Sequence, residues 1–163
     1  MDISFEGRLA QADAAYDAHD HRRALSLYLR LAMQGCVQAQ RQTAYMIDFG
    51  EGCRANPQIA VRWYRMAAEQ GDALSQNNLG ACLATGDGVR RDLVEAVRWF
   101  RRAAQQGNAR SQVRLGEMYE HGKGVPRDWR RAAHWYRLAA LQDWPEANDL
   151  LVTLLGRMAM AAE

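Results

Sequence analysis

The sequence predicts an all-α fold, a right-handed α-solenoid of stacked antiparallel helix hairpins. The first observation is a period of 36 residues, because Trp63, Trp99 and Trp135 recur at that spacing and each is followed by Tyr or Phe. The second is a set of glycines with the same period, such as Gly71 and Gly107. A fixed period between 20 and 50 residues is typical of solenoids, in which each unit buries its apolar face against the next unit.

Each unit is expected to hold two helices, and the segment from about 92 to 106 shows the signals used. Asp92 is a good N-cap, and Glu95 stands three residues later, in the capping-box position. Apolar residues then recur every three to four positions, and Gly107 ends the helix because glycine takes the left-handed conformation cheaply. The same reading, together with Asn56-Pro57 as an N-cap followed by proline at the first helical position, predicts nine helices at about 3–18, 21–34, 37–49, 57–70, 73–84, 92–106, 109–121, 128–142 and 145–161.

Two glycines, Gly80 and Gly116, lie inside the expected helices at the same place in successive units. A glycine inside a helix costs roughly 1 kcal/mol relative to alanine. We expect the compensation to be a backbone contact that is too close for any Cβ atom. The Trp columns are assigned to the core of the stack.

Composition and charge favour an ordinary globular protein, with 48% hydrophobic and 25% charged residues and a net charge of +2. That small charge gives no global field that would require nucleic acid or an anionic membrane. The chain shows no signal peptide and no apolar stretch of the length of a membrane span. Three cysteines are an odd number and cannot form a complete disulfide framework, so we expect a cytoplasmic protein with reduced thiols.

Several motifs recur with the 36-residue period. They resemble the Sel-one-like repeat (SLR) family, a branch of the tetratricopeptide-like solenoids, over about residues 36–142. The motifs are A-x-x-W-[YF]-x-x-A-A-x-Q-G at Ala60 to Gly71 and Ala96 to Gly107, S-Q-x-x-L-G at Ser75 to Gly80 and Ser111 to Gly116, and G-x-G-V at Gly86 to Val89 and Gly122 to Val125. The resemblance implies a scaffold or adaptor that binds peptides or partner domains and has no catalysis of its own.

We expect one solenoid domain over residues 1–163. Its units are an N-terminal tetratricopeptide-like hairpin, three repeats and a C-terminal capping helix. The corresponding ranges are 1–35, then 36–71, 72–107 and 108–142, and finally 143–163.

The first helix of each pair lines the concave face in the tetratricopeptide solenoids that this sequence resembles. Residues there change from unit to unit, so we assign partner binding to Arg41, Tyr45, Asn77, Asn78, Arg110, Arg114 and Glu117. Other inward positions in the three repeats are Gln38, Gln42, Asp48, Leu74, Ala81, Val113 and Glu120, and the first helix adds Phe5, Glu6, Leu9 and Asp13. Asparagine amides can hold the backbone of an extended peptide and arginines can bind a carboxylate. An acidic partner segment is therefore expected in this groove; the alternative is a solvated face without a ligand.

Other functions remain open from the residues. One is an immunity-type or antagonist protein that binds and blocks a folded toxin or enzyme. Residues 1–20 carry a net charge of −4 and residues 90–131 a net charge of +6. This asymmetry would allow head-to-tail association or an acidic partner; the alternative is ion pairs within a repeat, such as Arg65 with Glu69. The last helix is apolar on more than one face, so it is expected to cap the stack or to form a homodimer.

The chain carries no motif that is typical of an enzyme, a cofactor or a metal site. His19 and His21, with the acids beside them, could be drawn as a metal site, but alternate residues point apart and a solvated linker is favoured. We therefore expect no catalytic residue, cofactor, metal or nucleic acid.

Overall fold

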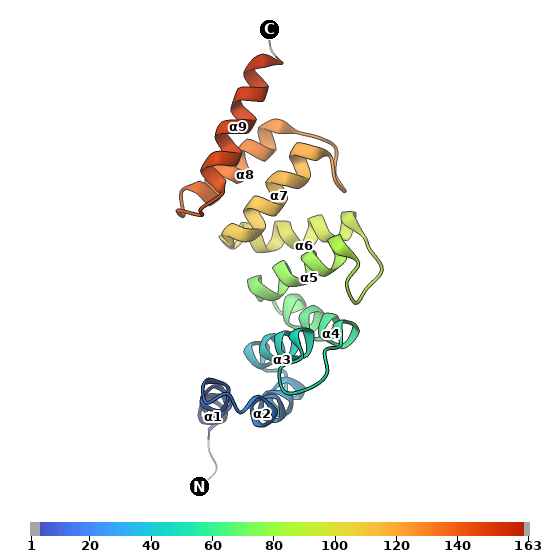
Figure 1. The fold of residues 1–163 in the computed structure, drawn as a ribbon, viewed down its shortest axis with the longest axis vertical. Helices are drawn as coiled ribbons and strands as arrows, with labels where there is room; N and C mark the ends of the chain where they lie inside the picture. The colour runs from blue at the N-terminus through green and yellow to red at the C-terminus, as the bar shows by residue number, and fades with distance from the viewer. Residues whose placement is uncertain (1–3, 162–163) are drawn as a thin grey trace.

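The structure, a computed structural model, describes residues 4–161, which form nine α-helices and no strand. Figure 1 shows the helices following one another from α1 at one end to α9 at the other. Helices that pack closely are neighbours in the sequence, from α1 with α2 to α8 with α9. The predicted α-solenoid is confirmed. The helices are α1 (Phe5–Asp17), α2 (His21–Met33), α3 (Val37–Phe49), α4 (Pro57–Glu69), α5 (Ala73–Thr85), α6 (Leu93–Gln105), α7 (Ala109–His121), α8 (Trp129–Ala140) and α9 (Ala147–Met160).

The ends of the helices confirm the predicted caps. The Asp92 carboxylate accepts a hydrogen bond from the backbone N–H of Glu95 at 2.8 Å. Asn56 caps α4, and Pro57 is its first residue. Gly107 follows α6 with φ +87°, a left-handed conformation that costs little only in glycine.

The most deeply buried aromatic column is the one that follows the tryptophans. Its members are between 0 and 2% exposed, and they are Tyr64, Phe100 and Tyr136. Among the three tryptophans, Trp99 is buried, whereas Trp63 and Trp135 are half-buried at the edge of the core. The prediction that all three tryptophans form the core is therefore correct for one of them and needs correction for the other two.

Trp99 is buried because its polar N–H group has a partner. Its Nε1 donates to Glu95 Oε1 at 3.1 Å, and the same oxygen is 2.7 Å from Arg65 Nη1. Ile59 and Arg131 stand at the corresponding positions before the other two tryptophans, and neither offers an acceptor. The carboxylate of Glu95 thus binds these side chains, so the predicted capping box is only half formed.

The helical glycines leave room for an aromatic ring of the next helix. A Cβ atom on Gly80 would lie 2.9 Å from the Phe100 ring, and one on Gly116 would lie 2.5 Å from the Tyr136 ring. The predicted close approach is present, but the contact is with a side chain and not with a backbone. Ring and glycine together determine how closely successive helices pack.

Buried amides link each unit to the next. Gln76 Nε2 donates to the carbonyl oxygen of Ala68 at 3.1 Å, and Gln76 Oε1 accepts from Gln106 at 2.8 Å. The same arrangement recurs in two further pairs, Gln40 with Gln70 and Gln112 with Gln142. The recurring polar residues are therefore used in stacking, like the recurring apolar ones.

Candidate functional site

A pocket of about 350 Å³ lies across the first helices of successive units, on α3, α5, α7 and the segment before α9. Because residues three units apart line one pocket, this face of the solenoid is hollowed. The pocket is called the groove below, and its defining residues are Arg41, Tyr45, Leu74, Asn78, Arg110 and Trp144.

The two arginines of the groove differ in their partners. Arg41 Nη1 lies 2.7 Å from Asp72 Oδ2, and the other Asp72 oxygen caps the first turn of α5, so the Arg41 charge is neutralised within the fold. Arg110 is exposed and has no carboxylate within 4.0 Å among residues 4–161. Arg110 can therefore bind an incoming anion without breaking an internal ion pair.

Apolar side chains line the rest of the groove. The Tyr45 ring rests on Phe49 with 4.7 Å between ring centroids, which holds it in place at the wall. Leu74 is half exposed, and Trp144 is partly buried. The groove thus offers aromatic and aliphatic surface next to a free guanidinium group.

Asn77 and Asn78 do not act as the pair of free amides that the sequence predicted. Asn77 is buried, its Nδ2 donates to Asn78 Oδ1 at 3.1 Å, and its Oδ1 accepts from Ser111 Oγ at 3.0 Å. It therefore connects α5 to α7. Asn78 is half-buried and remains at the surface of the groove.

The remaining predicted residues of α7 lie in two environments. Arg114 and Glu117 line a second pocket beside the groove and pair with each other at 3.1 Å. Val113 and Glu120 were expected to face inward as surface residues, but both are buried against neighbouring helices. The period placed them on the correct helix without showing that the following unit covers them.

Trp144 was not among the predicted site residues. It stands 36 residues after Asn108 and 72 after Asp72, both of which are helix N-caps, so it departs from a polar column. A large aromatic residue at a position where the preceding repeats have the small residues Cys36, Asp72 and Asn108 is the signal that could have identified it. In the structure it closes the groove on the side of α9.

The described residues offer little to covalent or metal chemistry. Burial, followed by the charges of Asp48 and Asp87, raises the pKa of Cys82 to about 12, so this thiol stays protonated near neutral pH. No group of three or more His, Cys, Asp or Glu side chains within the described ranges could hold a metal ion. Between residues 4 and 161 no helix has the length and apolar character to cross a membrane.

Comparisons with known proteins agree with this geometry. The Sel1 repeat family model matches residues 11–36, 37–72, 73–108 and 109–144. No curated protein matches the chain.

Among solved structures, the chain is similar to a Sel1 repeat protein from Oxalobacter formigenes, with 33% identity and a TM-score of 0.83 over 87% of this chain and 58% of that one. It is also similar to c5321, a protective antigen of uropathogenic Escherichia coli with an SLR fold, with 34% identity and a TM-score of 0.82 over 85% of this chain and 30% of that one. The Helicobacter pylori cysteine rich protein B shares the fold at 18% identity and a TM-score of 0.65, over 80% of this chain and 96% of that one.

The chain thus spans 58% and 30% of the lengths of the first two proteins. Its four matched repeats nevertheless cover most of its own length. The chain belongs to the Sel1 repeat family, whose members typically mediate protein–protein interactions and are generally non-catalytic scaffolds.

Proposed function

We propose that the chain is a non-catalytic adaptor that binds an extended segment of a partner protein in the groove. The observation that carries this proposal is that recurring residues and varying residues lie in different places. The recurring rings, the helical glycines and one glutamine of each recurring pair are buried between helices. Side chains that change between units gather in one pocket, with Trp144 closing it. A surface that stacking does not use is free to select a partner.

The chemistry of the groove favours a segment with both acidic and apolar side chains. Arg110 can bind a carboxylate through two parallel hydrogen bonds. Tyr45, Leu74 and Trp144 can cover an apolar side chain, and Asn78 can bond to the backbone of the segment. The partner is therefore an acidic, partly apolar peptide segment, bound in the cytoplasm, where the three free cysteines of the chain stay reduced.

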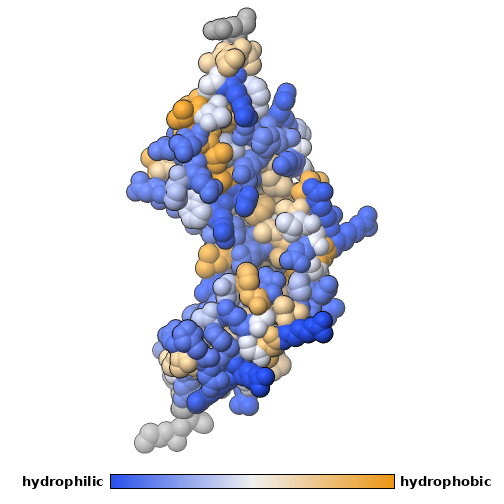
Figure 2. All heavy atoms as spheres, viewed as in Figure 1, coloured by the Kyte–Doolittle hydropathy of each residue, from blue (hydrophilic) through white to orange (hydrophobic). Residues whose placement is uncertain are grey.

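The last helix supports a second contact, between two copies of the chain. Leu155 stands in α9 where Tyr119 stands in α7, and Val152 stands where α7 has Gly116. In α7 both positions are buried, whereas Val152 and Leu155 are exposed among the described residues. Figure 2 shows apolar surface gathered over the part of the molecule where α9 lies. The proposed homodimer is tested by comparing the masses of the wild type and Val152→Glu in solution by light scattering.

The groove is tested by charge reversal at Arg110 and Arg114. Wild-type protein and the double variant Arg110→Glu/Arg114→Glu are used as baits in a lysate of the native organism, and the captured proteins are identified by mass spectrometry. We expect the partner to be captured by the wild type and lost with the variant. The melting temperature should stay nearly unchanged, because Arg110 is unpaired among the described residues and Arg114 loses only an exposed ion pair with Glu117.

The matched control is Arg98→Glu/Arg130→Glu, which makes the same charge change at exposed residues of α6 and α8. It should retain the partner. A partner that survives reversal at Arg110 and Arg114 contradicts the proposal. Peptides that tile the captured partner then separate the two functions, since a free peptide competes for the groove, whereas an antagonist of a folded toxin or enzyme binds only the folded protein.

A further inference from the structure

Two columns of the repeat change together along the chain. Sixteen residues before each buried ring lies a position that is Asp48, Ala84 or Glu120 in the three repeats. An acid precedes Tyr64 and Tyr136, whose rings carry a hydroxyl group. Alanine precedes Phe100, whose ring carries none.

Where the acid is present, it lies beside polar groups of the neighbouring helices. Glu120 Oε2 accepts a hydrogen bond from the Tyr136 hydroxyl at 2.8 Å, and Glu120 Oε1 is 2.6 Å from Arg157 Nη1 of α9. In the first repeat, burial and the charge of Asp87 raise the pKa of Asp48, and a hydrogen bond with Tyr64 partly offsets this rise.

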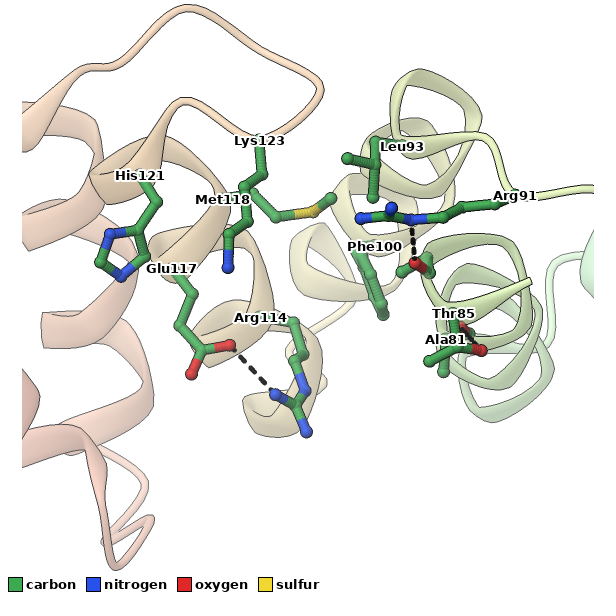
Figure 3. Close-up of a pocket in the computed structure, with 11 residues that line it drawn as sticks. Ala81, Thr85, Arg91, Leu93, Phe100, Arg114, Glu117, Met118, His121 and Lys123 are labelled. Atoms are coloured by element: carbon green, nitrogen blue, oxygen red, sulfur yellow. Dashed lines mark hydrogen bonds and ion pairs between the residues drawn. The ribbon is translucent and has the colours of Figure 1, made fainter. Parts of the chain in front are cut away.

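Where alanine replaces the acid, a pocket of about 400 Å³ is open between α5, α6 and α7. Figure 3 shows Leu93, Phe100 and Met118 directed into this space, with Ala81 on the α5 side. His121, which lines the pocket, stands 36 residues before Arg157 and so takes its place in this repeat. We call this space the Phe100 pocket. Its volume falls in the lower part of the range of about 300–1,000 Å³ that ligand sites occupy.

Basic side chains surround the Phe100 pocket. Arg91 and Lys123 lie on opposite sides of it in Figure 3, and the Arg91 Nε donates to the carbonyl oxygen of Ala84 at 3.0 Å, which fixes the guanidinium group at the rim. Within residues 4–161, Arg91, His121 and Lys123 have no carboxylate within 4.0 Å. The single acid in the lining, Glu117, pairs with Arg114. The rim thus has an excess of positive charge.

We propose that the Phe100 pocket binds a bulky apolar side chain of the partner segment, and that a neighbouring carboxylate of the same segment binds Arg91 and Lys123. The apolar floor and the basic rim match these two parts, and the carboxylate compensates for the acid that this repeat lacks. This inference rests on the proposed function, because Arg110 of the groove and Arg114 of the Phe100 pocket are one turn apart on α7. The partner class is an acidic peptide with an aromatic or large aliphatic anchor.

The decisive variant gives this repeat the acid and the tyrosine that the next repeat has. Ala84→Glu/Phe100→Tyr reproduces the Glu120–Tyr136 pair, places a carboxylate near His121 and fills the pocket from inside. Because the neighbouring repeat tolerates the same residues, we expect the melting temperature to be kept.

The probe is a random peptide library displayed on phage and selected on wild-type protein, with the strongest peptide then synthesised and titrated by fluorescence anisotropy. Selected sequences should share a bulky apolar residue within two positions of Asp or Glu. The chosen peptide should bind Ala84→Glu/Phe100→Tyr at least tenfold more weakly than the wild type. Arg91→Glu/Lys123→Glu, which alters exposed residues alone, should show the same loss and covers the case in which the core variant does not fold.

The control Arg98→Glu/Arg130→Glu should bind like the wild type. Selection that yields no such motif, or a peptide that binds the filled pocket as tightly as the wild type, overturns the inference. If that peptide is nevertheless lost with the single variant Arg110→Glu, which alters the groove and not the lining of the Phe100 pocket, the groove proposal stands and the Phe100 pocket alone is rejected.

Discussion

The helix pair α7–α8 and the helix pair α5–α6 each accommodate a buried aromatic ring, but they do so with different neighbouring residues. In both, a helical glycine admits the ring of the following helix. Between α7 and α8 that ring is Tyr136, whose hydroxyl group donates a hydrogen bond to the buried Glu120. Between α5 and α6 it is Phe100, with Ala84 in place of the acid, and a pocket remains. The repeat therefore fixes the backbone spacing and leaves the chemistry of the gap free to vary.

The largest expected effect comes from deleting either ring. Tyr136→Ala and Phe100→Ala should each lower the free energy of unfolding by roughly 3–5 kcal/mol, because both rings are fully buried between helices. Urea denaturation followed by circular dichroism measures this. The comparison requires both rings to be structural, so a loss below about 1 kcal/mol at either position would break it.

The hydroxyl group should matter at one ring and not at the other. Tyr136→Phe removes the hydrogen bond to Glu120 and should cost about 1.5–3 kcal/mol, the range for hydrogen bonds to charged groups. Phe100→Tyr places a hydroxyl beside the open pocket and should leave stability nearly unchanged. Equal effects in the same denaturation experiment would show that the two interfaces do not differ as described.

Replacing the helical glycine by alanine should likewise cost more stability between α7 and α8 than between α5 and α6. Gly116→Ala brings a Cβ within 2.5 Å of a ring that its hydrogen bond holds in place, and overpacking costs roughly 1–3 kcal/mol. Gly80→Ala should cost less, since its contact is 2.9 Å and the Phe100 ring can shift toward the open pocket. Gly156, also helical, has no neighbour within 4 Å, so Gly156→Ala should raise the melting temperature through helix propensity alone.

The smallest effect concerns Glu95, which gives α6 its buried tryptophan. Burial raises its pKa, but hydrogen bonds from Arg65 and Trp99 outweigh burial, and the pKa lies below its usual value. A lowered pKa in the folded state stabilises the fold above the unfolded value of about 4.3, and this contribution is lost as the pH falls through the folded value.

Glu95→Gln should therefore cost up to about 1 kcal/mol at pH 7, as expected for a partly exposed ion pair. The difference from the wild type should shrink as the pH falls to about 3. Denaturation at both pH values measures it, with the exposed Glu69→Gln as the control. A difference that does not change with pH would remove Glu95 from this account.

The sequence alone was sufficient to predict the features that recur with the 36-residue period. The helices, the cap at Asp92 and the close packing at Gly80 could all be predicted, because each depends on local signals that the period repeats. The burial of the tryptophans could not be predicted. It depends on the hydrogen-bond acceptor at Glu95, which does not recur at the corresponding positions of the other repeats. The same limit applies to Asn77, whose partner Ser111 comes from another unit, and to Trp144, which lies where the repeat pattern ends.

The central claim is that side chains on α3, α5 and α7 select the partner, whereas the recurring residues hold the stack together. Hydrogen–deuterium exchange of the protein, free and bound to its captured partner, tests this claim most directly. We predict that binding protects backbone amides in peptides from α3, α5 and α7 and around Trp144, and leaves α4 and α8 unchanged. Protection confined to α4 and α8 would contradict the claim.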